Sequence, residues 1–103
     1  MVPVRELAEQ IYNVARLILN KTNIRVAKLY GGVPHDTQIR DLKQGVDIII
    51  STTGRLIDFL NSKKVSLSAL KYLIIDEADR LLDMGFEKQL NEILTAQGKY
   101  YSY

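Results

Sequence analysis

The 103-residue sequence contains no cysteine, which excludes disulfides, thiolate metal ligands and a cysteine nucleophile. Its single histidine, His35, excludes a histidine-based zinc site and a two-histidine mechanism. No apolar run approaches the roughly 20 residues of a membrane span. Residues 1–6 carry charge where a signal peptide would have an apolar core. We therefore expect a soluble protein of the cytoplasm or nucleus, with no membrane partner.

The sequence also lacks a large excess of charge of either sign. The 14 basic residues exceed the 12 acidic ones by a net charge of +2, too little to attract nucleic acid by bulk electrostatics. A nucleic-acid site would therefore depend on local geometry. The 47% hydrophobic content is enough for one small domain, and the 25% of charged residues exclude a disordered polyelectrolyte.

Hydrophobic periodicity predicts helices that alternate with strands. Helices are expected from just after Pro3 to about Lys21, over 37–43, from 53 to about 61, and from about 79 to 95 with Gly85 as a weak point. Strands are expected over 24–30, 46–51 and 72–75, and a short turn over 66–70. Helices between strands favour a parallel sheet with helices on both faces. With three strands, the sheet is expected to be unfinished on at least one side.

Polar turns follow the three predicted strands, at the edge where parallel sheets bind ligands. They are Gly31-Gly32, Thr52-Thr53-Gly54-Arg55 and Asp76-Glu77-Ala78-Asp79. At a strand end, Asp76 could hold Mg²⁺ through water while Glu77 orients an attacking water. Both acids fit equally well as caps of the next helix, where negative charge meets the helix dipole. The two acids alone leave both interpretations open.

The string around these acids resembles a known motif. Residues 73–87, LIIDEADRLLDMGFE, closely resemble the second motif of the DEAD-box RNA helicases and its downstream extension. Other pieces follow in the family's order: Pro3-Val4-Arg5-Glu6-Leu7-Ala8 with Gln10-Ile11, then Gly31-Gly32, Gly45-Val46-Asp47-Ile48, and Thr52-Thr53-Gly54-Arg55-Leu56 with Asp58. The resemblance implies an α/β fold, a parallel sheet flanked by helices, of the RecA-like (P-loop NTPase) type. Residues 1–94 would be a partial helicase ATP-binding domain that lacks its phosphate-loop strand, and 95–103 a divergent tail.

The resemblance also implies roles for the polar turns. Asp76 would associate with Mg²⁺ through water, Glu77 would activate the hydrolytic water, and Asp79 would link the nucleotide and RNA sites. The residues implied to contact RNA are Pro3, Arg5, Gly31, Gly32, Thr52, Thr53, Gly54 and Arg55. Arg5 and Arg55 each fall in the first turn of a predicted helix, where free N–H groups attract phosphate. Taken alone, each arginine is better explained as a solvated surface charge.

The sequence departs from the family pattern at two positions and lacks several of its motifs. Val4 replaces a threonine, which is expected to weaken RNA binding by roughly 0.5–1.5 kcal/mol, one hydrogen bond. Thr53 replaces a proline at the first position of a helix, a milder change. The phosphate loop, the Ser-Ala-Thr motif and the second RecA-like domain with its arginine finger do not occur in the sequence. Because an arginine finger alone contributes about 10³–10⁵ in rate, we expect no ATP turnover from this chain by itself.

Three functions are therefore considered. The first is an ATP-dependent RNA helicase that uses ATP and Mg²⁺, acts on single-stranded or duplex RNA, and works with the remainder of the helicase core. The second is a non-catalytic module that binds RNA or a helicase through the same edge. The third, from the pattern alone, is a small receiver-like domain in which Asp76 accepts a phosphoryl group, although such a domain needs five strands.

Overall fold

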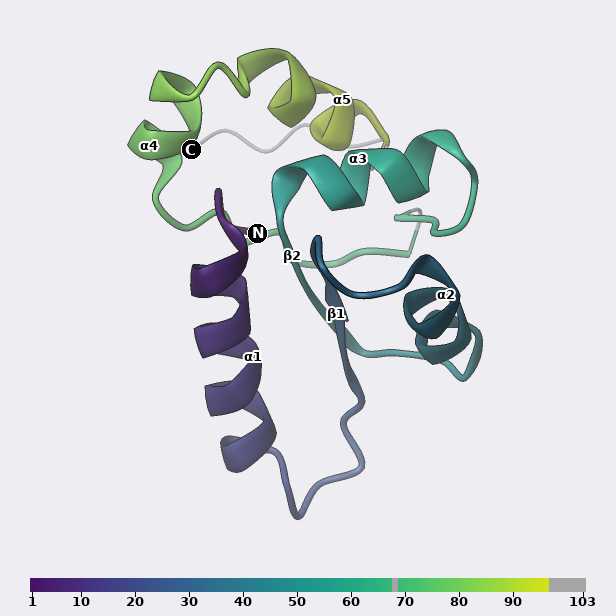
Figure 1. Ribbon diagram of the computed structural model, residues 1–103. Helices are drawn as coiled ribbons and strands as arrows, with labels where there is room; N and C mark the ends of the chain where they lie inside the picture. Colours follow the sequence, from purple (N-terminus) through teal and green to yellow (C-terminus); the bar gives the residue numbers. More distant parts are fainter. Residues whose placement is uncertain (68, 97–103) are drawn as a thin grey trace.

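The computed structural model describes residues 1–67 and 69–96 (Figure 1). Its helices are α1 (Arg5–Ile18), α2 (His35–Lys43), α3 (Thr53–Asn61), α4 (Ala78–Asp83) and α5 (Glu87–Ala96), and its strands are β1 (Val26–Leu29) and β2 (Ile48–Ser51). Within these residues, no helix has the length and apolar character that crossing a membrane requires. Most of the predicted tail, 97–103, lies outside the described residues, as does Ser68 in the predicted turn.

The two strands form a parallel sheet, as predicted. Their register pairs Val26 with Ile48 and runs to Leu29 with Ser51. Parallel strands buried on both faces are expected to be continuously apolar, and β2 begins with three isoleucines. The turn from β1 into α2 contains Gly32, whose φ of 82° is readily available only to glycine.

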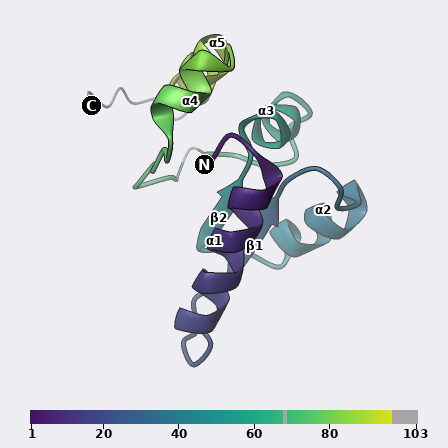
Figure 2. The ribbon, with the colours of Figure 1, turned by 60° about the vertical axis from the view of Figure 1, so that its left-hand side comes forward.

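The core is divided between the two faces of the sheet, because successive residues of a strand point to opposite sides. On one face, Leu29 packs with Leu56, Phe59, Leu67 and Ile93, which come mainly from α3 and α5. On the other face, Tyr30 packs with Val2, Ala8 and Ile50 beneath α1. In Figure 2, α1 lies across the sheet, with α2 and α3 to the other side. The predicted arrangement of helices on both faces is therefore confirmed.

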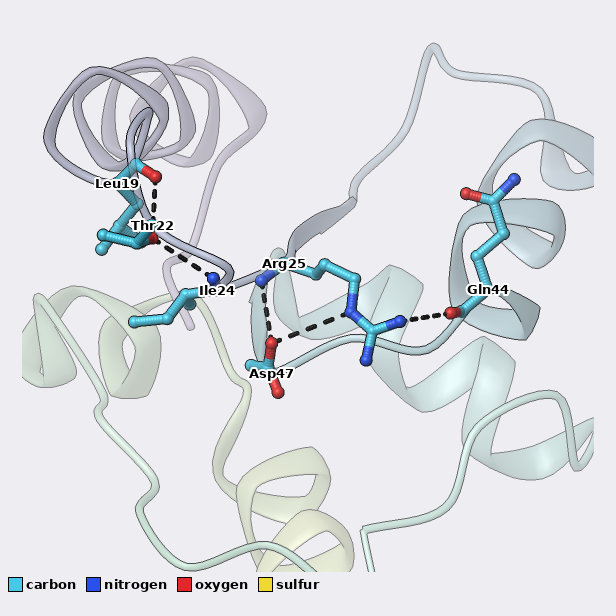
Figure 3. A network of polar contacts seen from close by, with 6 residues as sticks. All are labelled: Leu19, Thr22, Ile24, Arg25, Gln44 and Asp47. Atoms are coloured by element: carbon cyan, nitrogen blue, oxygen red, sulfur yellow. Dashed lines mark hydrogen bonds and ion pairs between the residues drawn. The ribbon is translucent and has the colours of Figure 1, made fainter.

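Polar contacts join the two strands at their amino ends, the end opposite to the glycine and threonine turns (Figure 3). The Arg25 backbone N–H donates to Asp47 Oδ2 at 2.8 Å, and its Nη1 donates to the Gln44 carbonyl at 2.6 Å. The guanidinium also packs against Gly45, where an added Cβ would come within 2.9 Å of it. These contacts fix how the turn before β2 meets the start of β1.

The predicted strand over residues 72–75 does not form. The segment is extended, with the side chains of Tyr72 and Ile74 83% and 75% exposed. It is separated from β2 by the N-terminus, because Val2 bonds to Ser51 of β2 while Met1 bonds to Ile74. A strand needs a hydrogen-bonded neighbour along its length, and among residues 1–67 and 69–96 only Met1 provides one.

The single helix predicted from 79 to 95 is also wrong, because it is interrupted at the predicted weak point. Gly85 has a φ of 83° and separates α4 from α5. Its N–H donates to the Leu82 carbonyl and the N–H of Phe86 donates to the Leu81 carbonyl, both at 3.0 Å. This is the Schellman pattern in which a glycine just past the last turn satisfies the final carbonyl groups of a helix.

Candidate nucleic-acid interface

Four polar turns meet at the carboxyl edge of the sheet. They are residues 3–5 at the start of α1, 31–33 after β1, 52–55 at the start of α3 and 76–79 at the start of α4. The first and third are joined by the bridge between Val2 and Thr52, and the first and fourth by the bond from the Asp76 N–H to the Met1 carbonyl at 3.0 Å. The predicted convergence of the turns on one edge is therefore found.

Arg5 lies against the glycine turn. It is the first residue of α1, exposed, and follows Val4, whose side chain provides no cap for the helix. A Cβ added at Gly32 would overlap the Arg5 guanidinium, so glycine both permits the turn and makes room for the arginine. Burial raises the pKa of the neighbouring Tyr30 phenol, and Arg5 partly opposes that rise. Arg5 and Gly32 thus form a single exposed feature on this edge.

Arg55 occupies a different environment. It is half-buried, and its Nη1 donates to Gln38 Oε1 at 3.1 Å and to the Val33 carbonyl at 3.4 Å. Gln38 is fully buried and in turn donates through Nε2 to the Tyr30 carbonyl at 3.0 Å. The interpretation of Arg55 as a solvated surface charge is therefore wrong. The arginine ties α3 to the turn that contains the two glycines.

The remaining candidates for RNA contact differ in exposure. Pro3 and Thr53 are buried, Gly31 and Thr52 are half-buried, and Gly54 is exposed. Thr52 is the N-cap residue of α3, but its side chain makes no capping hydrogen bond. Since the Thr53 side chain faces the interior, this turn can offer a ligand its main chain more readily than its hydroxyl groups.

The hydroxyl of Thr53 is buried, and none of the described residues forms a hydrogen bond with it. A buried polar atom without a partner destabilises a protein by about 1–3 kcal/mol. Thr53→Val keeps the shape and removes that atom, so we expect the free energy of unfolding to rise by about 1 kcal/mol. Urea denaturation followed by circular dichroism measures this change. An unchanged or lower urea midpoint would show that the Thr53 hydroxyl does find a partner. The matched control is Thr22→Val, because the hydroxyl of Thr22 is exposed and hydrogen-bonded.

The acidic turn combines exposure with backbone strain. Asp76, Glu77 and Asp79 are all exposed. Asp76 Oδ1 accepts the Glu77 N–H at 3.0 Å, and Glu77 Oε2 lies 3.3 Å from Arg80 Nη1. Glu77 has φ 55° and ψ 47°, the left-handed conformation, which disfavours a residue with a Cβ by about 1–2 kcal/mol. Such strain is concentrated at functional sites, which favours the functional interpretation of the turn over simple capping.

The residues present fit Mg²⁺ better than they fit a nucleotide. Among the described residues, no three acidic or histidine side chains gather around one point. Mg²⁺ needs only one or two carboxylates when water and phosphate supply its other ligands, and Asp76 is accessible for that. No glycine-rich turn ending in lysine cradles a triphosphate, because the sequence has none.

The arginine-bearing turns and the strained acidic turn thus lie at the carboxyl edge of a parallel sheet in an α/β domain. A family model described as DEAD/DEAH box helicase matches residues 1–100. The chain belongs to the DEAD/DEAH box helicase family. This assignment replaces the receiver-like interpretation.

Curated relatives and solved structures agree with this family assignment. The chain is 51% identical over 94 residues to the DEAD-box ATP-dependent RNA helicase 52A of Oryza sativa subsp. japonica and 50% identical to the human probable ATP-dependent RNA helicase DDX17. These matches cover 91% of this chain but only 16% and 13% of those proteins. A hypothetical ATP-dependent RNA helicase from Sulfolobus tokodaii superimposes with a TM-score of 0.87 at 37% identity, covering 94% of this chain and 29% of that one. The partial RecA-like α/β fold is thus confirmed.

Sequence reasoning missed two features of the site. For Gln38 the sequence predicts only that it lies in a short polar helix, and nothing in the pattern of that helix marks one of its residues as buried. Met1 and Val2 were expected before the first helix but not within the sheet, because two residues are too few to show an alternation. Their place is set by distant contacts: Val2 bonds to Ser51, 49 positions away, and Met1 bonds to Asp76, 75 positions away.

Proposed function

We propose that this chain forms part of an ATP-dependent RNA helicase and supplies one side of its RNA track together with its acidic motif. The observation that carries the proposal is the meeting of the Arg5, Gly32 and Arg55 turns on one edge, beside the acidic turn. Family membership supports the proposal, because the family model matches residues 1–100, which include both kinds of turn. In this proposal, coupling between nucleotide and RNA runs across a single edge of the sheet.

RNA is contacted through its sugar–phosphate backbone. The exposed Arg5 guanidinium pairs with a phosphate, and the first-turn N–H groups of α1 and α3 support the neighbouring phosphates. Gly31, Gly32 and Gly54 let the strand approach the main chain closely, while Pro3, Thr52 and Thr53 shape the turns. Arg55 acts mainly by holding the turn after β1 in place. Contacts of this kind position RNA without reading its sequence.

The acidic turn serves ATP hydrolysis in the complete helicase. Asp76 would hold Mg²⁺ through water, and the bound ion would supply positive charge opposite the phosphates. Glu77 accepts a proton from the attacking water, and Asp79 connects this turn to the RNA side. The phosphate cradle and arginine finger must come from other parts of the helicase core, so ATP turnover requires them. The cytoplasm or nucleus, where RNA is found, is the compartment that goes with this function.

RNA binding by Arg5 provides the test. We expect Arg5→Ala to weaken binding of a short single-stranded RNA about fivefold to tenfold and to lower the salt slope by about 0.7, the value of one phosphate contact. Fluorescence anisotropy at about 50 and 200 mM salt measures both quantities. Arg16→Ala is the matched control, because Arg16 is exposed on the same helix but bonds to Tyr12, away from the edge. Equal losses in the two variants would contradict the proposed track.

A further inference from the structure

Lys28 occupies a position in β1 where an apolar residue is expected. Alternate residues of a strand point to one face, so Lys28 lies in line with Val26 and Tyr30, which pack beneath α1. Strands of a parallel sheet with helices on both faces are usually apolar at such positions. Lys28 is half-buried there. A charged residue in such a row needs either an ionic partner or a route by which its head group reaches solvent.

The aromatic rings of two tyrosines flank the Lys28 ammonium group. Its Nζ lies 4.9 Å from the centre of the Tyr12 ring of α1 and 5.9 Å from the centre of the Tyr30 ring. These contacts attract the charge, but lysine also has three N–H donors, and within residues 1–67 and 69–96 no carboxylate or carbonyl accepts them. Arg16, on the same ring, instead donates to the Tyr12 hydroxyl at 3.2 Å. Lys28 therefore has donors available for a ligand.

The open side of β1 gives the Lys28 head group a route to solvent. In the described part of the chain, β1 pairs with β2 and has no strand on its other side. A lysine whose stem is buried usually extends its ammonium group to such an edge. Lysine on an edge strand also prevents unwanted strand pairing. That role is served by an exposed lysine, whereas Lys28 is half-buried and held against two rings.

Tyr30 connects Lys28 to the proposed RNA track. It directly precedes the glycine turn, and Arg5 is close enough to its phenol to lower the pKa against the effect of burial. On α1, Tyr12 follows Arg5 by seven residues, which places it on the same face of the helix and about 10 Å from the carboxyl edge. Lys28 and Arg5 thus lie along one side of α1. Glu9 lies near this line, but it is exposed and forms no ion pair with Lys28.

We propose that Lys28 binds a phosphate of a single-stranded RNA that continues from Arg5 along the side of α1. This inference rests on the proposed function, because Arg5 holds the preceding part of the strand. The phosphate oxygens accept the N–H donors of the ammonium group, and the two rings keep that group in place. A basic surface with aromatic side chains is the usual combination for binding single strands. The RNA therefore bends over the carboxyl edge, and the chain binds a longer strand than the edge alone accommodates.

The test compares single-stranded RNAs of about 5 and about 12 nucleotides on the 103-residue chain. Lys28→Met keeps the apolar stem against the rings and removes the charge. We expect it to weaken binding of the longer RNA about fivefold and to lower its salt slope by about 0.7, the value of one phosphate contact, while binding of the shorter RNA stays unchanged. Lys28→Arg keeps the charge and should retain the affinity for the longer RNA. Fluorescence anisotropy measures all of these quantities.

Lys21→Met is the matched control. Lys21 is an exposed lysine beyond the last residue of α1, at the opposite end of the helix from Arg5, so the variant removes the same charge and should leave the binding of both RNAs unchanged. Equal losses in the two methionine variants, or a loss in Lys28→Met that is the same for both RNA lengths, would overturn the inference.

Arg5→Ala distinguishes the failure of this inference from that of the proposed function. It should weaken the binding of both RNAs, because both lengths use the carboxyl edge. A loss in Arg5→Ala without any loss in Lys28→Met would overturn the extension along α1 alone. No loss in Arg5→Ala would overturn the proposed track, and the extension with it.

Discussion

Replacing Gln38 with alanine lowers the free energy of unfolding by about 3 kcal/mol. Gln38 is fully buried and links the Tyr30 carbonyl at 3.0 Å to Arg55 Nη1 at 3.1 Å. Without its amide, the carbonyl of the buried Tyr30 loses a donor and the half-buried guanidinium loses an acceptor, each a loss of about 1–3 kcal/mol when uncompensated. The cavity left by the side chain adds to this. Urea denaturation followed by circular dichroism gives the value.

Gln44→Ala is the matched control for this prediction. Gln44 lies at the C-cap of the same helix and is exposed, so its replacement should change the free energy of unfolding by less than about 0.5 kcal/mol. The Gln38 variant should also weaken RNA binding, because the link from Arg55 through Gln38 to the Tyr30 carbonyl is lost and the longer bond from Arg55 to the Val33 carbonyl remains to hold the turn after β1. Similar stabilities for the two variants would mean that the link between α2, α3 and the glycine turn contributes little.

Much of the fold follows from local patterns that the final structure respects. The apolar run around Ile48–Ile50 predicts a buried strand because such a run can be buried on both faces. Strands alternating with helices predict a parallel sheet, and parallel strands place the glycine, threonine and acidic turns on one edge. These inferences depend on residues close together in the sequence.

The wrong or missed predictions concern residues whose structure depends on contacts with residues far away in the sequence. Residues 72–75 have the composition of a strand, but a strand also requires a neighbour to bond with, and within the part of the chain that the structure describes Met1 alone provides it. The burial of Gln38 likewise depends on Arg55, 17 residues away. Polar residues in a short helix are predicted to face solvent, and only the tertiary structure shows that this one faces inward.

Gly32→Ala is expected to disturb both stability and RNA binding. Its φ of 82° disfavours a residue with a Cβ by about 1–2 kcal/mol, and the added Cβ would overlap the Arg5 guanidinium. The arginine must then move, so RNA affinity should fall about as far as in Arg5→Ala. Denaturation and fluorescence anisotropy measure the two effects separately.

Gly31→Ala and a double variant make the Gly32 prediction specific. A Cβ at Gly31 has no atom within 4 Å and no positive φ to oppose it, so Gly31→Ala should leave stability nearly unchanged. If Gly32 acts on RNA through Arg5, the pair Arg5→Ala and Gly32→Ala binds RNA no more weakly than Arg5→Ala alone, since coupled residues are not additive. Additive losses would mean instead that RNA lies directly against the Gly32 backbone. The double variant therefore decides whether this glycine positions an arginine or forms part of the binding surface itself.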